Sequence, residues 1–440
     1  MRQLFLPARF FWLFGAVIVL FAAAFALPGL LPLARVALLG AVALVIVDAL
    51  LLFRPQTRIA AERQLPRIFS LSDENPVRIE LHNRSAQPLR LTVIDELPVQ
   101  FQQRDFERSL PLAPGARETL RYTLRPTSRG VYAFGAINVF LETRLGLLQR
   151  RHRADRPMEV AVYPSVIQMK DLSLRAVRSL ALDQGVKKIR RIGHSYEFEQ
   201  IKDYVRGDDY RSINWKATGR HNRLMVNQYT DERAQQVYCL IDKGRSMKMP
   251  FNGLSLLDYA INASLVISNV ALQKYDKAGL LTFSDKIGTT LKAERSPVQL
   301  QKILQALYQE KERPGESNYE LLYPIARKLI QGRSLIILFT NFESSYALER
   351  VLPYLRRINV LHLLVVVFFE NTEIDAYAHA EVHTLENIYT QSVAQQFLAE
   401  KRQIARTLHQ YGIQSIYTKP EELSINTVNK YLELKSRGLI

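Results

Sequence analysis

The chain has 440 residues, enough for two or three domains with a sizeable core. Its formal net charge of +17 would allow nucleic-acid binding, but the basic residues are scattered and the sequence carries no zinc-finger or RNA-binding signature. We therefore expect no nucleic-acid partner, and a negatively charged membrane surface or an acidic protein suits the charge better. The single cysteine, Cys239, excludes an internal disulfide framework and fits a reducing compartment.

Two apolar runs open the chain. Residues 10–31 and 33–53 are each about long enough to cross a bilayer, and Pro28-Gly-Leu-Leu-Pro32 forms the turn between them. Because a second span follows and no small-residue cleavage site separates the two, a cleaved signal peptide is disfavoured. The sequence predicts a transmembrane helical hairpin over residues 1–55.

Basic residues lie on both outer flanks of this hairpin and predict its orientation. They are Arg2, Arg9, Arg54, Arg58, Arg63 and Arg67. Since positive charge concentrates on the cytoplasmic side, both ends of the hairpin are expected in the cytoplasm, with Arg35 snorkelling near the outer turn. Asp48, near the inner interface, is interpreted as solvated or paired with Arg54 rather than as a functional intramembrane carboxylate.

Short alternating strands follow and predict a small antiparallel β-sandwich over residues 56–165, similar to immunoglobulin-like or fibronectin-like modules. The expected strands are residues 77–82, 89–95, 119–124, 130–134, 137–142 and 159–162. Asn83-Arg-Ser and Pro114-Gly supply turn residues between them. Catalytic groups do not cluster in this region of the sequence, which indicates a spacer or interaction module.

Residues 166–235 read as a basic linker followed by a dense polar segment. Residues 172–191 begin with a helical pattern and end in the run Lys187, Lys188, Arg190 and Arg191. This strip is either a solvated linker or a docking strip for an acidic partner or lipid headgroups.

From residue 236 to residue 440, apolar runs alternate with helical patterns. The expected strands are residues 237–241, 278–283, 289–291, 334–339, 360–368 and 413–417, and the expected helices are residues 257–273, 298–307, 319–329, 347–358 and 393–411. This alternation predicts a doubly wound, mainly parallel sheet with helices on both faces. The short strand at 289–291 follows its predecessor so closely that we expect it to be an antiparallel edge.

The polar segment concentrates acids and bases in a few turns of chain. Its members of interest are Asp203, Arg206, Asp208, Asp209, Arg211, Asn214 and Trp215, with Lys216 and Arg220 close behind. Gly207-Asp208-Asp209 reads as a turn, and Ser212 is placed to cap a following helix. The segment is interpreted as a structural or partner-docking cluster, in which Arg206, Asp208, Asp209 and Arg211 pair with one another and Trp215 packs under a guanidinium.

This segment closely resembles the signature of the domain-of-unknown-function 58 family, whose members carry a von Willebrand factor A-like domain. The matching residues are Asp203, Tyr204, Arg206, Gly207, Asp208, Asp209, Tyr210, Arg211, Ile213, Asn214, Trp215 and Lys216. Looser similarity covers Pro126 and Arg129-Gly-Val-Tyr132 in the preceding domain. The resemblance implies that the whole chain is a membrane-anchored multidomain protein of the bacterial inner membrane, with its soluble domains in the cytoplasm.

The resemblance also implies a divalent-metal site at the carboxyl ends of the strands. Its hard oxygen ligands would fall on Asp242, Ser246, Ser317 and Asn341. Gly244 removes one hydroxyl of the usual Asp-x-Ser-x-Ser loop and Asn341 is uncharged, so Mg²⁺ is expected to bind weakly if at all. Alternatively, Asp242 and Ser246 cap the loop and its following helix by accepting backbone N–H groups.

For function, the resemblance implies an interaction protein or adaptor that works with a MoxR-type AAA+ ATPase, because members of the family tend to be encoded beside such ATPases. No enzymatic activity and no required cofactor are expected, and Lys243 and Arg245 in the strand-end loop would favour an acidic partner.

The rival hypothesis is a metal-dependent hydrolase that uses Asp208, Asp209 and Asp242. A third option is a structural envelope protein that binds no ligand. A further pair of histidines, His379 and His383, lies near Glu373 and Asp375 but has no clear apolar stripe beside it.

Overall fold

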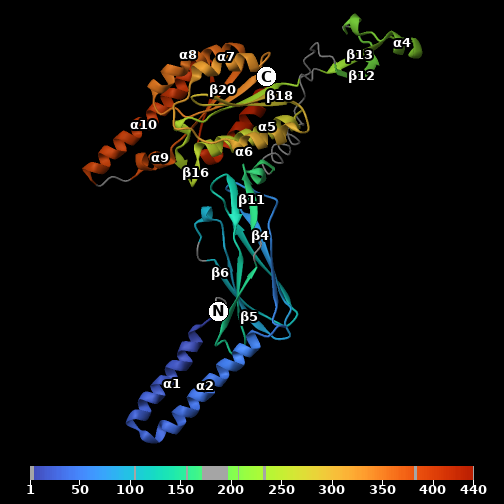
Figure 1. Cartoon of the computed structure of the whole chain (residues 1–440). Helices are drawn as coiled ribbons and strands as arrows, with labels where there is room; N and C mark the ends of the chain where they lie inside the picture. Colours follow the sequence, from blue (N-terminus) through green and yellow to red (C-terminus); the bar gives the residue numbers. More distant parts are fainter. Residues whose placement is uncertain are drawn as a thin grey trace. The chain divides into compact units, whose positions relative to one another are not determined.

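The chain forms two compact units, Met1–Val166 and Ile167–Ile440, coloured blue to green and green to red in Figure 1. The computed structural model describes residues 4–103, 106–154, 157–170, 197–206, 208–230, 234–380 and 384–439. The predicted helix at 172–191 and its basic run therefore lie outside the described residues, as do Gly207 and His383.

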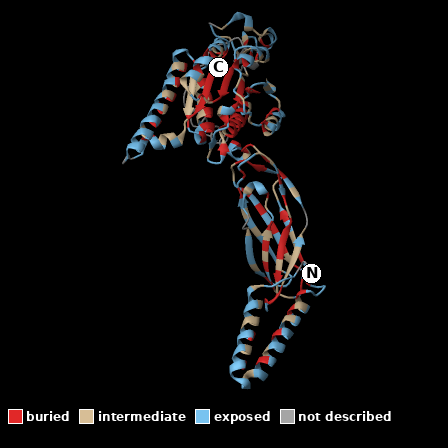
Figure 2. Ribbon diagram, turned by 60° about the vertical axis from the view of Figure 1, so that its left-hand side comes forward, coloured by how far each residue is buried: buried red, intermediate tan, exposed pale blue. Residues whose placement is uncertain are grey.

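The first unit begins with a helical hairpin. Helices α1 (Ala8–Ala26) and α2 (Leu31–Leu52) lie side by side and are joined by the short helix η1 (Pro28–Leu30). Both are long and apolar enough to cross a membrane by length and composition. Most of their residues are exposed (Figure 2).

Short strands make up the rest of the first unit. They are β1 (Leu4–Phe5), β2 (Ile59–Gln64), β3 (Ile68–Ser70), β4 (Asn75–Asn83), β5 (Leu89–Asp95), β6 (Glu107–Leu112), β7 (Arg117–Leu124), β8 (Gly130–Phe134), β9 (Ile137–Glu142), β10 (Gln149–Ala154) and β11 (Met158–Tyr163). Three sheets result, ordered β1-β10-β9-β5-β6, β2-β4-β7 and β3-β11-β8. All pairings are antiparallel except that of β3 with β11.

Alternation of buried and exposed side chains explains how two of these sheets face each other. Along β4, Ile79 and Leu81 are buried and their neighbours point outward. They share one core with Leu91 of β5 and Val139 of β9, in the other sheet. The sequence correctly indicated six strands but missed β1, β2, β3, β6 and β10, whose polar or short sequences carry a weaker alternation.

A buried ion pair lies within the first unit. The Arg63 guanidinium pairs with the Asp95 carboxylate, donates to the Gly135 carbonyl at 3.1 Å and lies 5.0 Å from the Phe134 ring centre. The Tyr122 hydroxyl donates to the same carboxylate, and burial together with the Asp95 charge raises the pKa of Tyr122. Arg63, predicted only as a flanking positive charge, is thus part of the interior.

Asp48 of α2 joins the helical hairpin to the strands. It is fully buried, and its carboxylate accepts hydrogen bonds from the Thr143 hydroxyl and from the backbone N–H groups of Leu147 (2.9 Å) and Leu148 (2.8 Å). The prediction of a solvated or Arg54-paired Asp48 is therefore wrong. The loop between β9 and β10 satisfies this carboxylate, which sequence proximity could not indicate.

The second unit is built on a six-stranded sheet, ordered β18-β17-β14-β19-β20-β21. The strands are β14 (Gln236–Asp242), β17 (Lys277–Phe283), β18 (Ile287–Glu294), β19 (Leu335–Phe339), β20 (Leu363–Phe369) and β21 (Gln414–Thr418). All neighbours are parallel except β17 and β18, so the predicted antiparallel edge is confirmed. A two-stranded hairpin, β15 (Pro250–Phe251) with β16 (Leu254–Ser255), lies outside this sheet.

Helices cover both faces of this sheet. They are α5 (Leu256–Gln273), α6 (Gln299–Gln309), α7 (Tyr319–Leu329), α8 (Ser345–Leu361), α9 (Thr372–His379), α10 (Leu385–Gln410) and α11 (Leu423–Ser436). α7, α8 and α10 share one core with the sheet, whereas α5 packs against β14 and β17 and is itself contacted by α11. The predicted strand at 360–368 begins too early, because α8 continues to Leu361, and α9 and α11 were not predicted.

Residues 197–206 and 208–230, here called the hairpin segment, form an antiparallel pair of β12 (Glu197–Asp203) and β13 (Met225–Thr230). Between the strands lie η3 (Tyr210–Ser212) and the short helix α4 (Trp215–His221). Asn214 caps α4 by accepting the Ala217 N–H at 3.0 Å. The prediction that Ser212 caps this helix is wrong, since its hydroxyl donates to the Asp209 carbonyl within η3.

Candidate functional site

The carboxyl ends of the neighbouring parallel strands β14 and β19 lie side by side, and the chain continues from them into helices that pack in different places. From β14 the chain enters α5, which packs against β14 and β17, and from β19 it enters α8, which belongs to the core with α7 and α10. Ligands of open α/β sheets bind in the crevice that such a divergence creates. Asp242 ends β14, and Thr340 and Asn341 directly follow β19, so their side chains meet at this strand-end cleft.

Asp242 is buried and its carboxylate is fully occupied by protein donors. One oxygen accepts the Ser317 hydroxyl and the Gly244 N–H at 2.8 Å. The other accepts the Thr340 hydroxyl at 2.8 Å and the Tyr319 hydroxyl at 3.3 Å. Burial raises the pKa of Asp242, and these hydrogen bonds oppose the rise. The carboxylate therefore ties three loops together, and its contact with Gly244 agrees with the loop-capping alternative.

Gly244 is needed for this arrangement. A Cβ at this position would lie 2.4 Å from the Ser317 hydroxyl oxygen and 3.1 Å from an Asp242 oxygen. The absence of a side chain thus lets Ser317 reach Asp242. In the sequence, Gly244 stands for a missing hydroxyl ligand. In the structure, it leaves the space that the hydrogen bond between Ser317 and Asp242 requires.

A lysine lies on the other side of the cleft. Lys401 of α10 is only 3% exposed, and its ammonium donates to the Phe342 carbonyl and, at 3.4 Å, to the Asn341 side-chain oxygen. Burial lowers the pKa of Lys401 to about 8. Asn341 in turn donates to the Ser246 backbone carbonyl at 3.4 Å. Ser246 and Asn341 are therefore neighbours, as the strand ends predicted, but an ammonium accompanies them.

These residues do not fit a hydrated divalent metal. The Asp242 oxygens already accept four protein donors, and the Asn341 oxygen faces an ammonium. Among the residues that the structure describes, no group of three or more His, Cys, Asp or Glu could hold a metal ion. His379 lies on α9 and contacts Asp375, with its ring nitrogen 2.9 Å from that residue's carbonyl oxygen.

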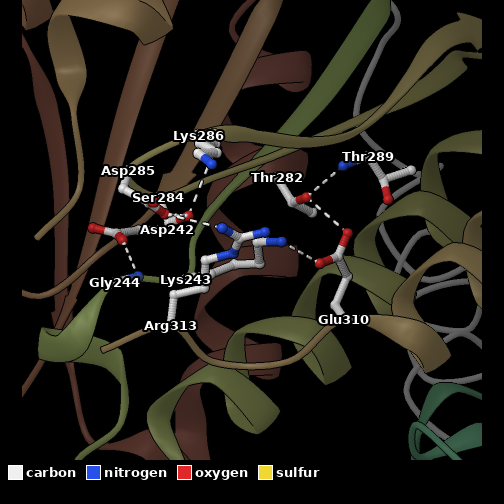
Figure 3. A network of polar contacts seen from close by, with 10 residues as sticks. All are labelled: Asp242, Lys243, Gly244, Thr282, Ser284, Asp285, Lys286, Thr289, Glu310 and Arg313. Atoms are coloured by element: carbon white, nitrogen blue, oxygen red, sulfur yellow. Dashed lines mark hydrogen bonds and ion pairs between the residues drawn. The ribbon is translucent and has the colours of Figure 1, made fainter. Parts of the chain in front are cut away.

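Lys243 is not available to a partner, contrary to the prediction. It is buried and forms an ion pair with Glu310, which also accepts the Thr282 hydroxyl at 2.8 Å (Figure 3). Burial tends to raise the pKa of Glu310, but hydrogen bonds from Lys243, Thr289 and Thr282 outweigh it and hold that pKa below its ordinary value. The pair locks the loop after β14 against the end of α6.

Arg245 lies on the exposed rim of the cleft. Its guanidinium is 3.3 Å from Glu316 and 3.6 Å from Glu343, and Arg350 pairs with Glu316 at 2.9 Å. The rim is thus a mixed network of exposed charges rather than the basic surface that the sequence suggested.

Two hollows open beside Ser246 and Asn341. The larger, of about 400 Å³, also touches Lys401 and is walled by Met249, Pro250, Phe251, Leu256, Phe369, Ile374 and Phe397. The smaller, of about 290 Å³, reaches Asp242 and Ser317. Pockets that recognise ligands are typically apolar with a few fixed polar groups. The larger hollow combines its apolar wall with a charged group made up of Arg245, Glu343, Glu370, Glu373 and Lys401.

The hairpin segment places its charges differently from the prediction. Asp208 pairs with Lys202 at 2.9 Å and accepts the Val205 N–H at 3.0 Å, and both contacts lower the pKa of Asp208. Asp209 accepts the Arg211 N–H at 3.0 Å. The predicted mutual pairing of Arg206, Asp208, Asp209 and Arg211 is therefore wrong: the turn after β12 returns Asp208 to the strand's own lysine.

Apolar side chains of the hairpin segment are open to solvent. Trp215, Tyr210 and Val205 are 71%, 69% and 62% exposed. The Arg211 guanidinium lies 5.7 Å from the centre of the Tyr210 ring, whereas the expected partner of a guanidinium was Trp215. Asp203 is 4.0 Å from Arg223. Among the residues that the structure describes, Asp208 and Asp242 have no hydrogen-bonding or ion-pair partner in common.

Three residues of the cleft were missed from the sequence: Tyr319, Thr340 and Lys401. Lys401 had a usable signal, because it continues the buried helical stripe of Ala394, Leu398, Ile404 and Leu408. A lysine at a core position of an amphipathic helix indicates a buried partner for its ammonium. Thr340 directly follows an apolar strand, which is the position that predicted Asn341.

Comparison with known proteins gives one family. The model described as "Protein of unknown function DUF58" matches residues 200–394, from the hairpin segment to α10. The "Uncharacterized protein YeaD" of Bacillus subtilis (strain 168) is 24% identical over 216 residues, which is 45% of this chain and 51% of that protein. The chain thus spans about half the length of this curated relative.

Similar solved structures match only parts of the chain. The ASH/PapD-like domain of human CEP192 has a TM-score of 0.20 at 14% identity, over 26% of this chain and 89% of that domain. Proximal thread matrix protein 1 of the mussel byssus has a TM-score of 0.27 at 11% identity, over 46% of this chain and 45% of that one. At these scores neither similarity supports a functional argument.

Proposed function

We propose that this chain is a membrane-tethered interaction protein that binds a protein partner, a MoxR-type AAA+ ATPase, through its second unit. The observation that carries the proposal is the strand-end cleft. Asp242 has both oxygens occupied by protein donors, while an open, largely apolar hollow of about 400 Å³ lies beside it. A carboxylate whose oxygens already accept hydrogen bonds from the protein is poorly suited to proton transfer or metal binding. A largely apolar hollow is suited to binding a partner.

We assign the second unit a von Willebrand A-like fold. The parallel sheet with one antiparallel edge, the helices on both faces and the acidic residue at the end of β14 support this assignment. The resemblance of the hairpin segment supplies the expected ATPase partner. We likewise assign the strands of the first unit to an immunoglobulin-like sandwich that serves as a spacer.

Exposed apolar side chains support the interaction role. Besides Trp215 and Tyr210, the first half of α10 exposes Leu385, Ile388 and Tyr389. Contiguous exposed apolar residues mark interaction sites on soluble surfaces.

For location, we propose the bacterial inner membrane, crossed by α1 and α2, with both soluble regions in the cytoplasm. The apolar helices and their flanking arginines support this orientation. A C-terminal phosphatase reporter, which is active only outside the inner membrane, should be inactive. An active reporter would reverse the orientation.

Capture of the detergent-solubilised full-length protein tests the partner. The tagged wild type should retain the MoxR-type ATPase of the same cell, and Trp215→Ala should reduce retention at least tenfold without changing the melting temperature. Val360→Ala is the matched control, because Val360 is also highly exposed but lies on α8. Equal retention by both variants would remove the hairpin segment from the interface, and failure of the wild type to retain the ATPase would refute the partnership.

A further inference from the structure

Lys401 occupies a position where an apolar residue would be expected. It continues the buried stripe of α10, and its side chain is almost completely withdrawn from solvent. Burying an ammonium is costly unless protein groups replace its water. Its placement therefore calls for a role that an apolar residue at this position could not fill.

The acceptors of Lys401 lie on a single loop. Its ammonium donates to the Phe342 carbonyl and the Asn341 side-chain oxygen, both directly after β19. The adjacent Glu400 accepts the Ser345 N–H at 2.7 Å, which fastens α10 to the same loop a second time. Two neighbouring residues of α10 thus fix the loop that forms one wall of the cleft.

The position of the charge is as informative as its contacts. Asn341 is one of two oxygen-bearing residues that follow β19 at the cleft, the other being Thr340, and the Asn341 side-chain oxygen lies 3.4 Å from the Lys401 nitrogen. A Mg²⁺ ion bound to that oxygen at ~2.1 Å would lie within roughly 5.5 Å of the ammonium. Like charges at this separation repel strongly in a buried setting.

We propose that the ammonium group of Lys401 takes the place of a divalent cation in the strand-end cleft, so that the cleft is held together and engages its partner without metal. The statement about the partner rests on the proposed function, whereas the statement about the cation does not. It also explains the pairing of a neutral Asn341 with a buried lysine: a single positive charge needs fewer anionic ligands than a dication does.

The inference changes what Asn341→Asp should do. The sequence alone suggests that a second carboxylate strengthens metal binding. In this structure the new carboxylate would form an ion pair with Lys401 instead. A metal site should appear only when the carboxylate is added and the ammonium is removed together.

Isothermal titration with Mg²⁺ on the detergent-solubilised full-length chain tests this. Wild type, Asn341→Asp and Lys401→Met should show no binding up to millimolar Mg²⁺, whereas the double variant Asn341→Asp/Lys401→Met should bind at least tenfold more tightly than any of them. Lys302→Met, which removes an exposed lysine of α6, is the matched control. Tight binding by wild type or by Asn341→Asp alone would overturn the inference, as would a folded double variant that binds no Mg²⁺.

A second measurement decides the matter if the lysine variants fail to fold. Mg²⁺ should not raise the melting temperature of wild type or of Asn341→Asp, and a Mg²⁺-dependent rise in either would overturn the inference. The titration and the partner capture separate the two proposals. Absence of any captured partner refutes the proposed function, while the titration still decides the role of Lys401.

Discussion

The hairpin segment and the six-stranded-sheet domain of the second unit are both rich in charged and polar residues, yet they use them differently. In the hairpin segment the side chains of Lys202 and Asp208 remain 37% and 24% exposed. In the second unit's sheet domain the side chains of Lys243 and Glu310 are only 6% and 7% exposed. Exposed pairs contribute little to stability, whereas removing one partner of a buried pair leaves an uncompensated charge. Charge density in a sequence thus shows where polar groups gather and not how much they stabilise.

The largest contrast should come from Glu310→Gln. It leaves Lys243 buried without a counter-charge and should cost about 3–5 kcal/mol, measured by chemical denaturation. Because the folded pKa of Glu310 lies below its ordinary value, its stabilisation is present above that ordinary value and disappears as the pH falls through the folded pKa. The variant should therefore lose less stability on acidification than wild type. Glu294→Gln, at an exposed pair, is the control, and equal losses for both variants would contradict the contrast.

Alanine at two glycines compares the regions sterically. Gly244→Ala forces Ser317 away from Asp242 and should cost about 1–3 kcal/mol. Gly219→Ala, in α4 of the hairpin segment, meets nothing within 4 Å and should leave stability unchanged or raise it by about 0.5–1 kcal/mol. Thermal unfolding measures both. If Gly244→Ala left the melting temperature unchanged, the hydrogen bond between Ser317 and Asp242 would not be required for stability.

Asp208→Ala should change the melting temperature little, because its ion pair with Lys202 is partly exposed to solvent. If Asp208 instead paired with a desolvated arginine, as a buried form of the predicted cluster would require, its removal would be strongly destabilising. Calorimetry distinguishes the two: a drop comparable with that of Glu310→Gln would restore the sequence-based interpretation and place the hairpin charges in a buried setting.

The smallest effect concerns the reactivity of Cys239, which is buried on β14. Its sulfur contacts the Ser264 carbonyl of α5 at 3.9 Å, and burial raises the pKa of the thiol to about 12. The thiolate is the reactive form, so the folded protein should not react with a maleimide at pH 8. Rapid labelling without denaturant would show that α5 opens readily.

Sequence patterns predicted the parts of the fold that depend on local periodicity. The alternation in β4 and the apolar run of β14 each identified a strand, and strand ends correctly brought Asp242 and Ser317 together. β10, with the sequence QRRHRA, escaped because its pairing with β9 needs no apolar alternation. The partners of Asp48 and Lys401 lie 59 to 100 residues away along the chain. Such contacts arise from tertiary packing, which residue spacing does not encode.

The hydrogen bonds of Asp48 have a consequence for the membrane span that we propose. They hold the last turns of α2 within the first unit, where Leu52 is part of the strand core. The stretch from Leu31 to Val47 is then left for lipid, and it rises only roughly 25 Å. This is shorter than the ~30 Å hydrocarbon thickness of a typical bilayer. A short span disfavours tilting and draws the headgroups inward, so the protein should prefer thin membranes and hold its strands close against the lipid surface.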